Sequence, residues 1–518
     1  MRRGIAPGVR LLGLCLPPWT LKQGCIYVGI WTYIVQVSYR LSRKPFSIVK
    51  PVLHANCTAI AESAGLTIVP ENATFCSWKP FEGENYGSLF GTLDLVYLFA
   101  YSVCLFIAGN IADLVDLRYF LGIGAILSGL TTILFGLAYF LDIHSYTFFV
   151  ITQLLGGASQ ASGYPAIVAS FGNWAGKSSR GLIMGIWTSH RDVGTVLGSL
   201  IAGAFVEYAW GWSFIVPGLI IGGLGILTIL LHLPYPEDVG LKISPQNTTM
   251  DESETESEEI SVKNGSETES EEISVKYGDS PVYSKCKRRL LDCGASGGRP
   301  ISICGALRIP GVVEFALSLF FIKLVTYTFM FWLPQYIYDR GGFHSSSSAY
   351  LSSFFDLGGL VGTIIAGIIH DKTGTNAVVC VAMFIIGLPT LLVFYWEGTS
   401  SVGSCIGLLI PLGFFINGPF SLITSVVSAD LGTHPSLEKN SRALATVSGI
   451  INGTGSLGAA LGPLLCGILK PVGWWSVFVM LFTSLILGIL LLSRLVKQEI
   501  CTWIRDRRNL TVPEDTKC

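Results

Sequence analysis

The stretch VVEFALSLFFIKLVTYTFMFWLPQYIY, at residues 312–338, is a long apolar segment with one lysine, Lys323, near its centre. Because a helix rises about 1.5 Å per residue, such a segment can cross the roughly 30 Å hydrocarbon layer of a bilayer. Eleven further apolar segments occur, at 22–42, 89–111, 119–140, 148–171, 182–206, 213–233, 349–370, 378–396, 402–427, 443–469 and 473–494. The sequence therefore predicts an all-α membrane protein with twelve transmembrane helices.

The composition agrees with a chain that lies mostly in lipid. Half of the residues (50%) are hydrophobic, only 13% are charged, and the mean hydropathy is +0.56. Soluble proteins carry about 25% charged residues, so this deficit requires an apolar solvent. The formal net charge of −1 gives no sign of a nucleic-acid partner.

Several features of the first six segments recur, in the same order, in the last six. GxxxD followed by a base ends the second and eighth segments. In the fifth and eleventh, an arginine precedes three glycines spaced four and then five residues apart. Trp-Ser opens the sixth and twelfth. The pairs are Gly109, Asp113 and Arg118 with Gly367, Asp371 and Lys372; Arg180, Gly194, Gly198 and Gly203 with Arg442, Gly458, Gly462 and Gly467; and Trp212-Ser213 with Trp475-Ser476. Glycine-rich helices can match by chance, but three ordered matches favour duplicated six-helix halves at 22–233 and 309–494. Duplicated halves are typical of transporters that alternate access to a midplane site.

Basic residues gather on one side of the predicted membrane, which the positive-inside rule makes cytoplasmic. This side holds the N-terminus (1–21), the linker between the halves (234–308) and the tail (495–518). The basic residues there include Arg2, Arg3, Arg10, Lys22, Arg118, Lys177, Arg180, Lys372, Lys439, Arg442, Arg494, Lys497, Arg505, Arg507 and Arg508. The loop 51–88 then lies on the lumenal or extracellular side, although Lys50 and Lys79 are exceptions to the charge pattern.

The loop 51–88 contains two sequons, Asn56-Cys57-Thr58 and Asn72-Ala73-Thr74, so Asn56 and Asn72 are predicted glycosylation sites. Cys57 and Cys76 share this loop and an oxidising compartment, and they form either a disulfide or two free thiols. No cysteine spacing is typical of a metal site.

The linker between the halves contains the repeat SETESEEISVK, at 253–263 and again at 266–276. Acidic, serine-rich sequence of this kind does not bury enough apolar surface to fold. It is interpreted either as a solvated linker or as a regulatory phosphorylated segment.

Lys323 is the clearest charge inside a predicted span. A cation at the bilayer centre costs roughly 2.5–3.5 kcal/mol or more, so a partner or a ligand is expected to offset that cost. Lys323 either binds an anion in a central cavity or pairs with an acid such as Asp356 or Asp94.

Charges near the ends of other segments leave more than one interpretation open. By hydropathy the first span ends near Leu41, which makes Arg43 an interface anchor; if the helix continues, Arg40, Arg43 and Lys44 lie on one side of it.

The fifth predicted span also contains charges. His190, Arg191 and Asp192 interrupt this span, where Arg191 and Asp192 form either an ion pair or part of a site. Gln160 breaks the fourth span before it, and His190 can donate a hydrogen bond or titrate near neutrality.

Five stretches resemble a known family. They are YRLSRKPFSIVK (39–50), GNWAGKSSRGLIMGIW (172–187), GALRIPGVVEF…KLVTYTFMFWLP (305–334), NGPFSLITSVVSADLGTH (417–434) and NGTGSLGAALGPLL (452–465). Together they resemble the sugar-phosphate exchangers of solute carrier family 37, nearest the animal glucose-6-phosphate exchangers of the endoplasmic reticulum. GxxxD with a following base also resembles the hallmark loop of the major facilitator superfamily, so Asp113, Arg118, Asp371 and Lys372 are expected to be gate charges.

The resemblance implies a major facilitator fold and a phosphate site. The related bacterial antiporters bind phosphate with one arginine from the first span and one from the seventh. The first corresponds to Arg43, with Lys44 beside it, whereas the second corresponds to Thr326, so Lys323 is expected to replace it. Leu105 and Tyr164 are further departures from the family pattern.

The resulting prediction is exchange of inorganic phosphate for a sugar phosphate, with Arg43, Lys44, Lys323, His190 and Gln160 in the binding site. The lipid bilayer is the only other partner expected, no cofactor or metal is expected, and the oligomeric state stays open. Two other classes compete: a facilitator of a neutral or cationic solute, in which Lys323 pairs internally, and a non-transporting scaffold that works through the acidic linker. An enzyme is not expected, because no nucleophile with its base is apparent.

Overall fold

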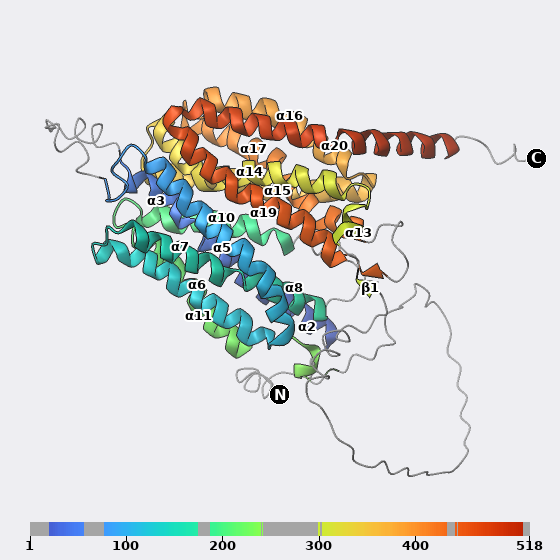
Figure 1. The fold of residues 1–518 in the computed structure, drawn as a ribbon, viewed down its shortest axis with the longest axis horizontal. Coiled ribbons are helices and arrows are strands. Elements are labelled where there is room, and N and C mark those ends of the chain that lie inside the picture. The colour runs from blue at the N-terminus through green and yellow to red at the C-terminus, as the bar shows by residue number, and fades with distance from the viewer. Residues whose placement is uncertain are drawn as a thin grey trace, which may run out of the picture.

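The computed structural model describes residues 20–55, 77–174, 187–239, 241, 299–300, 303–432, 441–442 and 444–510. Its long helices form two bundles that lie side by side, one coloured blue to green and the other yellow to red in Figure 1. The bundles correspond to the two halves predicted from the internal repeat. Asn56, Asn72, Cys57, Cys76 and the repeat at 253–276 lie outside the described residues.

The first half contains eight helices among its described residues. They are α2 (Leu21–Leu41), α3 (Pro45–Leu53), α5 (Tyr86–Leu114), α6 (Leu117–Phe140), α7 (Tyr146–Gln160), α8 (Gly163–Trp174), α10 (His190–Phe205) and α11 (Trp212–Leu231), followed by the short turn η2 (Pro236–Val239). Thr20 caps α2 in a reciprocal pair of hydrogen bonds with Gln23, which satisfies amides at the start of the helix.

The second half follows the same plan. It contains α13 (Ile303–Leu307), α14 (Val312–Gly341), α15 (Ser345–Thr373), α16 (Ala377–Glu397), α17 (Val402–Leu422), η3 (Ile423–Val427), α18 (Ser428–Gly432), α19 (Leu444–Leu469), η4 (Lys470–Val472) and α20 (Trp474–Leu510). Two short strands, β1 (Arg299–Pro300) and β2 (Ser441–Arg442), pair in parallel. Gly342 and Gly374 end α14 and α15 with φ of 63° and 64°, a conformation that favours glycine.

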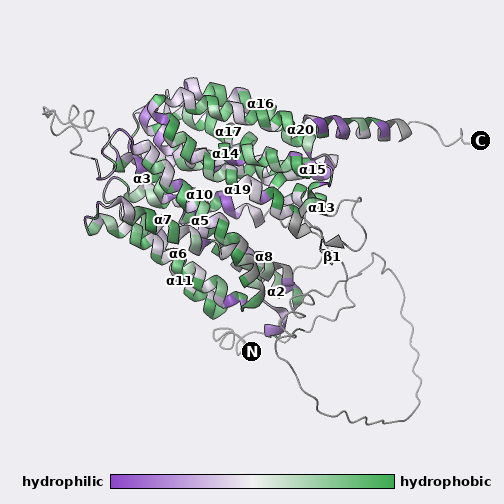
Figure 2. Cartoon of the chain, viewed as in Figure 1, coloured by the Kyte–Doolittle hydropathy of each residue, from purple (hydrophilic) through white to green (hydrophobic). Residues whose placement is uncertain are grey.

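Nine helices in the described part of the chain are long and apolar enough to cross a bilayer. The first, fourth and fifth predicted spans do not meet that criterion as single helices. The first corresponds to α2, which a break separates from α3; the fourth is divided between α7 and α8; and α10 begins only after the undescribed residues 175–186. The outer faces of the bundles are apolar (Figure 2), with exposed side chains such as Leu130, Leu219, Ile226 and Ile385, as expected for contact with lipid.

Two helical segments lie beyond the predicted spans. α2 ends at Leu41 as predicted, but after a short break the chain continues as α3 to Leu53, so Lys50 lies in a helix and not at the start of a loop. The last helix continues past residue 494 to Leu510, into the segment predicted as a tail. Its extension is hydrophilic (Figure 2), which is why hydropathy alone ended it early.

The halves touch mainly near one end of the molecule. We call this the loop end, where α3 ends and α5 begins, and the opposite end the terminus end, where α2 begins and α20 finishes. At the loop end Gly87 of α5 meets Gly467 of α19, and the Gly91 backbone lies against Leu464. Lys470 hydrogen-bonds to the Tyr86 hydroxyl, and its Nζ lies 2.9 Å from Asp339 Oδ2. These contacts close the space between the halves at the loop end.

Candidate functional site

A break in the first span brings two basic residues to the inside of the bundle. Pro45 has no amide proton to donate to the carbonyl of Leu41, so α2 ends there and α3 starts at Pro45. Arg43 and Lys44 lie in the break, and both side chains are buried. A Cβ atom at Gly198 of α10 would lie 2.8 Å from the Leu41 carbonyl oxygen and from Lys44 Cβ. The glycine stripe noted in the sequence therefore gives the break room to approach α10.

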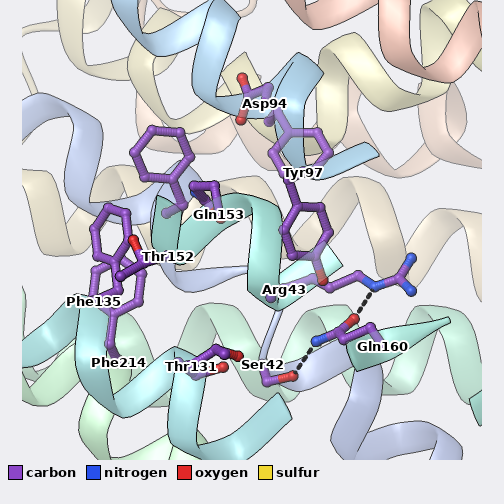
Figure 3. A pocket seen from close by; sticks show the side chains of 14 residues that line it. Ser42, Arg43, Asp94, Tyr97, Thr131, Phe135, Thr152, Gln153, Gln160 and Phe214 are labelled. Carbon is purple, nitrogen blue, oxygen red and sulfur yellow. Dashed lines mark hydrogen bonds between the residues drawn. The ribbon is translucent and has the colours of Figure 1, made fainter. Parts of the chain in front are cut away.

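The Arg43 side chain is held in place by neutral groups. Its Nε donates to Gln160 Oε1, and Gln160 Nε2 in turn donates to Ser42 Oγ at 2.9 Å. The guanidinium carbon lies 4.2 Å from the centre of the Tyr101 ring. Figure 3 shows the guanidinium beyond Gln160, at the edge of a cavity whose opposite side is formed by Phe135 and Phe214.

Three basic side chains from the two halves gather around one tyrosine of α14. Arg40 and Tyr327 line one cavity, and Arg40, Lys323 and Arg43 all lie near enough to Tyr327 to interact with it electrostatically. Lys323 Nζ donates to the Asn452 carbonyl oxygen at 3.3 Å. Within the described residues, no carboxylate lies at ion-pair distance from Arg40, Arg43 or Lys323. The alternative interpretation, in which Lys323 pairs with Asp356 or Asp94, is therefore wrong, while anion binding by Lys323 stays a prediction.

Both of those acids are paired with other lysines. Lys44 Nζ lies 3.8 Å from Asp356 Oδ2 and donates to the Met330 carbonyl oxygen at 3.2 Å. Pro334 has no amide proton for that carbonyl, which leaves it free to accept from the lysine. Lys44 of the first half is thus bound to α14 and α15 of the second half.

Lys50 makes a similar connection closer to the loop end. Its Nζ lies 2.6 Å from Asp94 Oδ2 and donates to the Phe331 carbonyl oxygen at 3.0 Å, and the two charged side chains are fully buried. The same ammonium lies 4.2 Å from the ring centre of Trp332. Lys50 thereby links α3 and α5 to α14 of the other half.

His190 and its neighbours lie at the start of α10. His190 Nδ1 is 2.6 Å from the Trp187 carbonyl oxygen, and its ring packs edge-on against Tyr33. Arg191 and Asp192 form an ion pair of 3.0 Å, and the guanidinium stacks over Phe420 at 4.1 Å. The structure shows the ion pair, and both residues also line a cavity between the halves, so their part in a site stays a prediction.

The predicted gate charges lie at the terminus end, in different surroundings. Arg118 is buried, donating to the His232 carbonyl oxygen at 3.1 Å and pairing with Asp238 at 3.3 Å, within its own half. Asp371 is exposed and lies 3.4 Å from His370 Nδ1. Lys372 is exposed as well, and the side chain of Asp113 lies outside the described part of the structure.

One further acid at the terminus end has a shifted pKa. Asp430 accepts from Asn376 Nδ2 at 3.2 Å, and its Oδ2 lies 3.5 Å from His370 Nε2. Burial acts to raise the pKa of Asp430, but the hydrogen bonds from His370 and Asn376 hold it below its ordinary value. Asp430 belongs to the SADLGTH stretch that the family resemblance quoted.

The sequence reasoning missed three parts of this arrangement. Arg40 was grouped with Arg43 and Lys44 in the sequence but was not predicted as a binding residue. Tyr327 lies one turn after Lys323, but nothing in the sequence separates it from other aromatic residues of the span. The Lys50–Asp94 pair was missed because hydropathy ended the helix before Lys50.

Comparison with known proteins agrees with this fold. Residues 63–463 match the family described as Major Facilitator Superfamily. A solved bacterial homologue of the human lysosomal transporter Spinster, described as inward-facing and unoccupied, superimposes with a TM-score of 0.58 at 14% identity, covering 93% of this chain and 98% of that one. At that identity the likeness shows the fold alone.

Much nearer relatives exist along almost the whole chain. Glucose-6-phosphate exchanger SLC37A2 of Danio rerio is 45% identical over 501 residues, covering 97% of each chain. Glucose-6-phosphate exchanger SLC37A2 of Homo sapiens is 43% identical, and the match covers 97% of each chain. Glucose-6-phosphate exchanger SLC37A1 of Homo sapiens is 42% identical, and the match covers 92% of this chain and 93% of that one. The chain therefore belongs to the major facilitator superfamily and, within it, to solute carrier family 37.

Proposed function

We propose that this protein exchanges inorganic phosphate for a sugar phosphate such as glucose 6-phosphate by alternating access. The observation that carries this proposal is the meeting of Arg40 and Arg43 with Lys323 around Tyr327, without a carboxylate partner among the described residues. The relatives named as glucose-6-phosphate exchangers support the same substrate pair. A neutral or cationic solute would leave these buried charges uncompensated.

The chemistry of the cluster suits a phosphoryl group. A phosphate monoester carries up to two negative charges, an arginine can hold two of its oxygens at once, and a lysine adds a point charge. Inorganic phosphate and a sugar phosphate share this group, so one cation cluster can bind either. Because the cations come from both halves, the bound anion favours their closure, while the empty cluster repels itself. This coupling is the physical basis for obligate exchange.

We further infer the orientation and the membrane. The positive-inside rule makes the terminus end cytoplasmic, and the halves meet at the loop end, so this conformation corresponds to an opening toward the cytoplasm. Lys44 and Lys50 then hold the lumenal side closed through their bonds to α14. The endoplasmic reticulum membrane is proposed on the family resemblance.

Counterflow in proteoliposomes tests the exchange. Labelled phosphate is expected to enter vesicles that contain phosphate or glucose 6-phosphate and not vesicles that contain neither. Arg43→Ala and Lys323→Ala are expected to abolish this uptake. Lys79→Ala is the control: it removes a charge from an exposed loop at the loop end and is expected to leave uptake unchanged. Equal uptake into loaded and empty vesicles contradicts exchange, and full activity of either site variant removes that residue from the site.

A further inference from the structure

A second cavity adjoins the cation cluster, and three of its buried polar atoms make no hydrogen bond. Its lining includes Arg40 and Tyr327 of the cluster, together with Thr326 of α14, Asp356 of α15, and Asn417 and Phe420 of α17. It therefore lies between the first half, which contributes Arg40 of α2 and Arg191, Asp192 and Thr195 of α10, and the second half, drawn in yellow to red in Figure 1. Both walls have to move when the transporter changes its opening.

Three of the lining side chains each present an oxygen without a hydrogen bond. These atoms are Thr326 Oγ1, Asp356 Oδ2 and Asn417 Oδ1, and the three side chains are 7%, 5% and 1% exposed. The Asp356 oxygen has Lys44 at 3.8 Å, which exceeds hydrogen-bond length. Because buried polar atoms in native proteins are almost always hydrogen-bonded, these three atoms offer unused hydrogen-bonding capacity to a polar molecule that enters the cavity.

The Asn417 side chain has a fixed place in this wall. It packs against Gly359 of α15, where a Cβ atom would lie 2.9 Å from Asn417 Cβ. Phe355 and Phe420 add flat apolar surface beside the polar atoms. Amide, carboxylate and hydroxyl groups next to aromatic rings match a pyranose, which has hydroxyls around its edge and C–H groups on its faces.

We propose that Thr326, Asp356 and Asn417 form the subsite for the sugar hydroxyls of the transported sugar phosphate. This inference rests on the proposed function, since the phosphoryl group must lie at the Arg40, Arg43 and Lys323 cluster for the sugar to reach the cavity. Inorganic phosphate binds only at the cation cluster, and water then occupies the subsite. The subsite therefore distinguishes the two exchanged substrates.

A rival position exists in the cavity of Figure 3, which Gln153, Thr131 and Thr152 line. That cavity lies almost wholly within the first half, and the Arg43 guanidinium points away from its far side. The threonine hydroxyls donate to carbonyls of their own helices, at 3.0 Å for Thr131 and 2.9 Å for Thr152. A sugar bound there would not connect the halves, so the cavity between the halves is favoured.

The test compares KM values in proteoliposomes loaded with phosphate. For Asn417→Leu and Thr326→Val, the ratio of the KM for labelled glucose 6-phosphate to that for labelled phosphate is expected to rise about tenfold per variant, the equivalent of one uncharged hydrogen bond. Thr326→Val keeps the side-chain shape and provides the result if Asn417→Leu lowers the amount of folded protein. Gln153→Leu is the matched control and is expected to keep the wild-type ratio.

The outcomes separate this inference from the proposed function. An unchanged ratio in both subsite variants, or a raised ratio in Gln153→Leu alone, overturns the subsite while exchange itself stands. Absence of any phosphate exchange by the wild-type protein overturns the proposed function and the subsite with it.

Discussion

At the residue scale, Lys50 and Asp94 show how a charge can be stable inside an apolar helix bundle. Their side chains are fully buried, 2.6 Å apart, and the ammonium has a second acceptor in the Phe331 carbonyl. Removing one partner of such a pair leaves a buried charge uncompensated, whereas removing both does not. The pair is therefore expected to matter for stability more than for substrate binding.

Lys50→Met is expected to destabilise the protein by about 3–5 kcal/mol, because Asp94 loses its countercharge. The double variant Lys50→Met/Asp94→Leu should recover most of that loss. Thermal unfolding of the purified protein in detergent measures both, with Arg43→Ala as a control that has no carboxylate partner in the described structure. A single variant as stable as the wild type would contradict this role.

Single residues also show what the sequence could predict. Lys323 was predicted as a site residue because a charge inside an apolar run requires a partner or a ligand, and Arg43 was predicted from the family resemblance. The meeting of both with Arg40 at Tyr327 was not predicted, since it depends on how α2 and α14 face each other. Lys44, expected beside the substrate, forms an ion pair with Asp356 and donates to the Met330 carbonyl, and its part in binding stays a prediction.

At the scale of elements, the glycines of α5 and α19 decide how closely the halves approach at the loop end. A Cβ atom at Gly467 would collide with the Gly87 carbonyl oxygen, so the two backbones are in contact there. Gly449, on the same helix α19, has no atom within 4 Å of such a Cβ position. The two positions therefore form a matched pair for a test of this contact.

Gly467→Val is expected to lower exchange at least about tenfold, because separating the backbones disfavours closure of the loop end by about 1.4 kcal/mol or more. Gly449→Val is expected to exchange at the wild-type rate. Phosphate counterflow at matched protein amounts measures both variants. Equal activity of Gly467→Val and Gly449→Val would show that this contact is not needed for closure.

The elements were predicted well where apolar runs are long and less well where they are broken. The glycine spacing in α10 and α19 was visible in the sequence, but the partner of each glycine was not. Pro45 ends α2 through one missing hydrogen bond, after which α3 carries the span on to Leu53. Hydropathy could not predict the hydrophilic extension of α20. In the structure, Glu499 of this extension accepts hydrogen bonds from the backbone amides at the start of α16.

At the scale of the whole molecule, the two halves form a structure that is closed at the loop end. Contacts there include Glu207 Oε1, which accepts from the Ser346 backbone amide at 2.9 Å and from its hydroxyl at 2.8 Å. The two-half plan was predicted from the internal repeat, because duplication leaves matched motifs in order. The opening was not predictable, since both openings of a transporter have the same sequence.

The proposed orientation predicts glycans on the loop 51–88. In microsomes from expressing cells, peptide N-glycosidase is expected to increase the gel mobility of the wild-type protein but not that of Asn56→Gln/Asn72→Gln. A tag fused to the C-terminus is expected to remain accessible to protease outside intact microsomes. A protected tag would reverse the proposed orientation. A wild-type band that the glycosidase leaves unchanged would remove the assignment of glycans to the loop 51–88.

The central claim is that Arg43 and Lys323 bind a phosphoryl group that both substrates share. Binding of labelled phosphate to the purified protein, with unlabelled competitors, tests it most directly. Glucose 6-phosphate is predicted to displace the label and glucose is not, and Arg43→Gln and Lys323→Met are each predicted to lose the binding. Wild-type binding retained in both variants, or displacement by glucose as effective as by glucose 6-phosphate, would contradict the account.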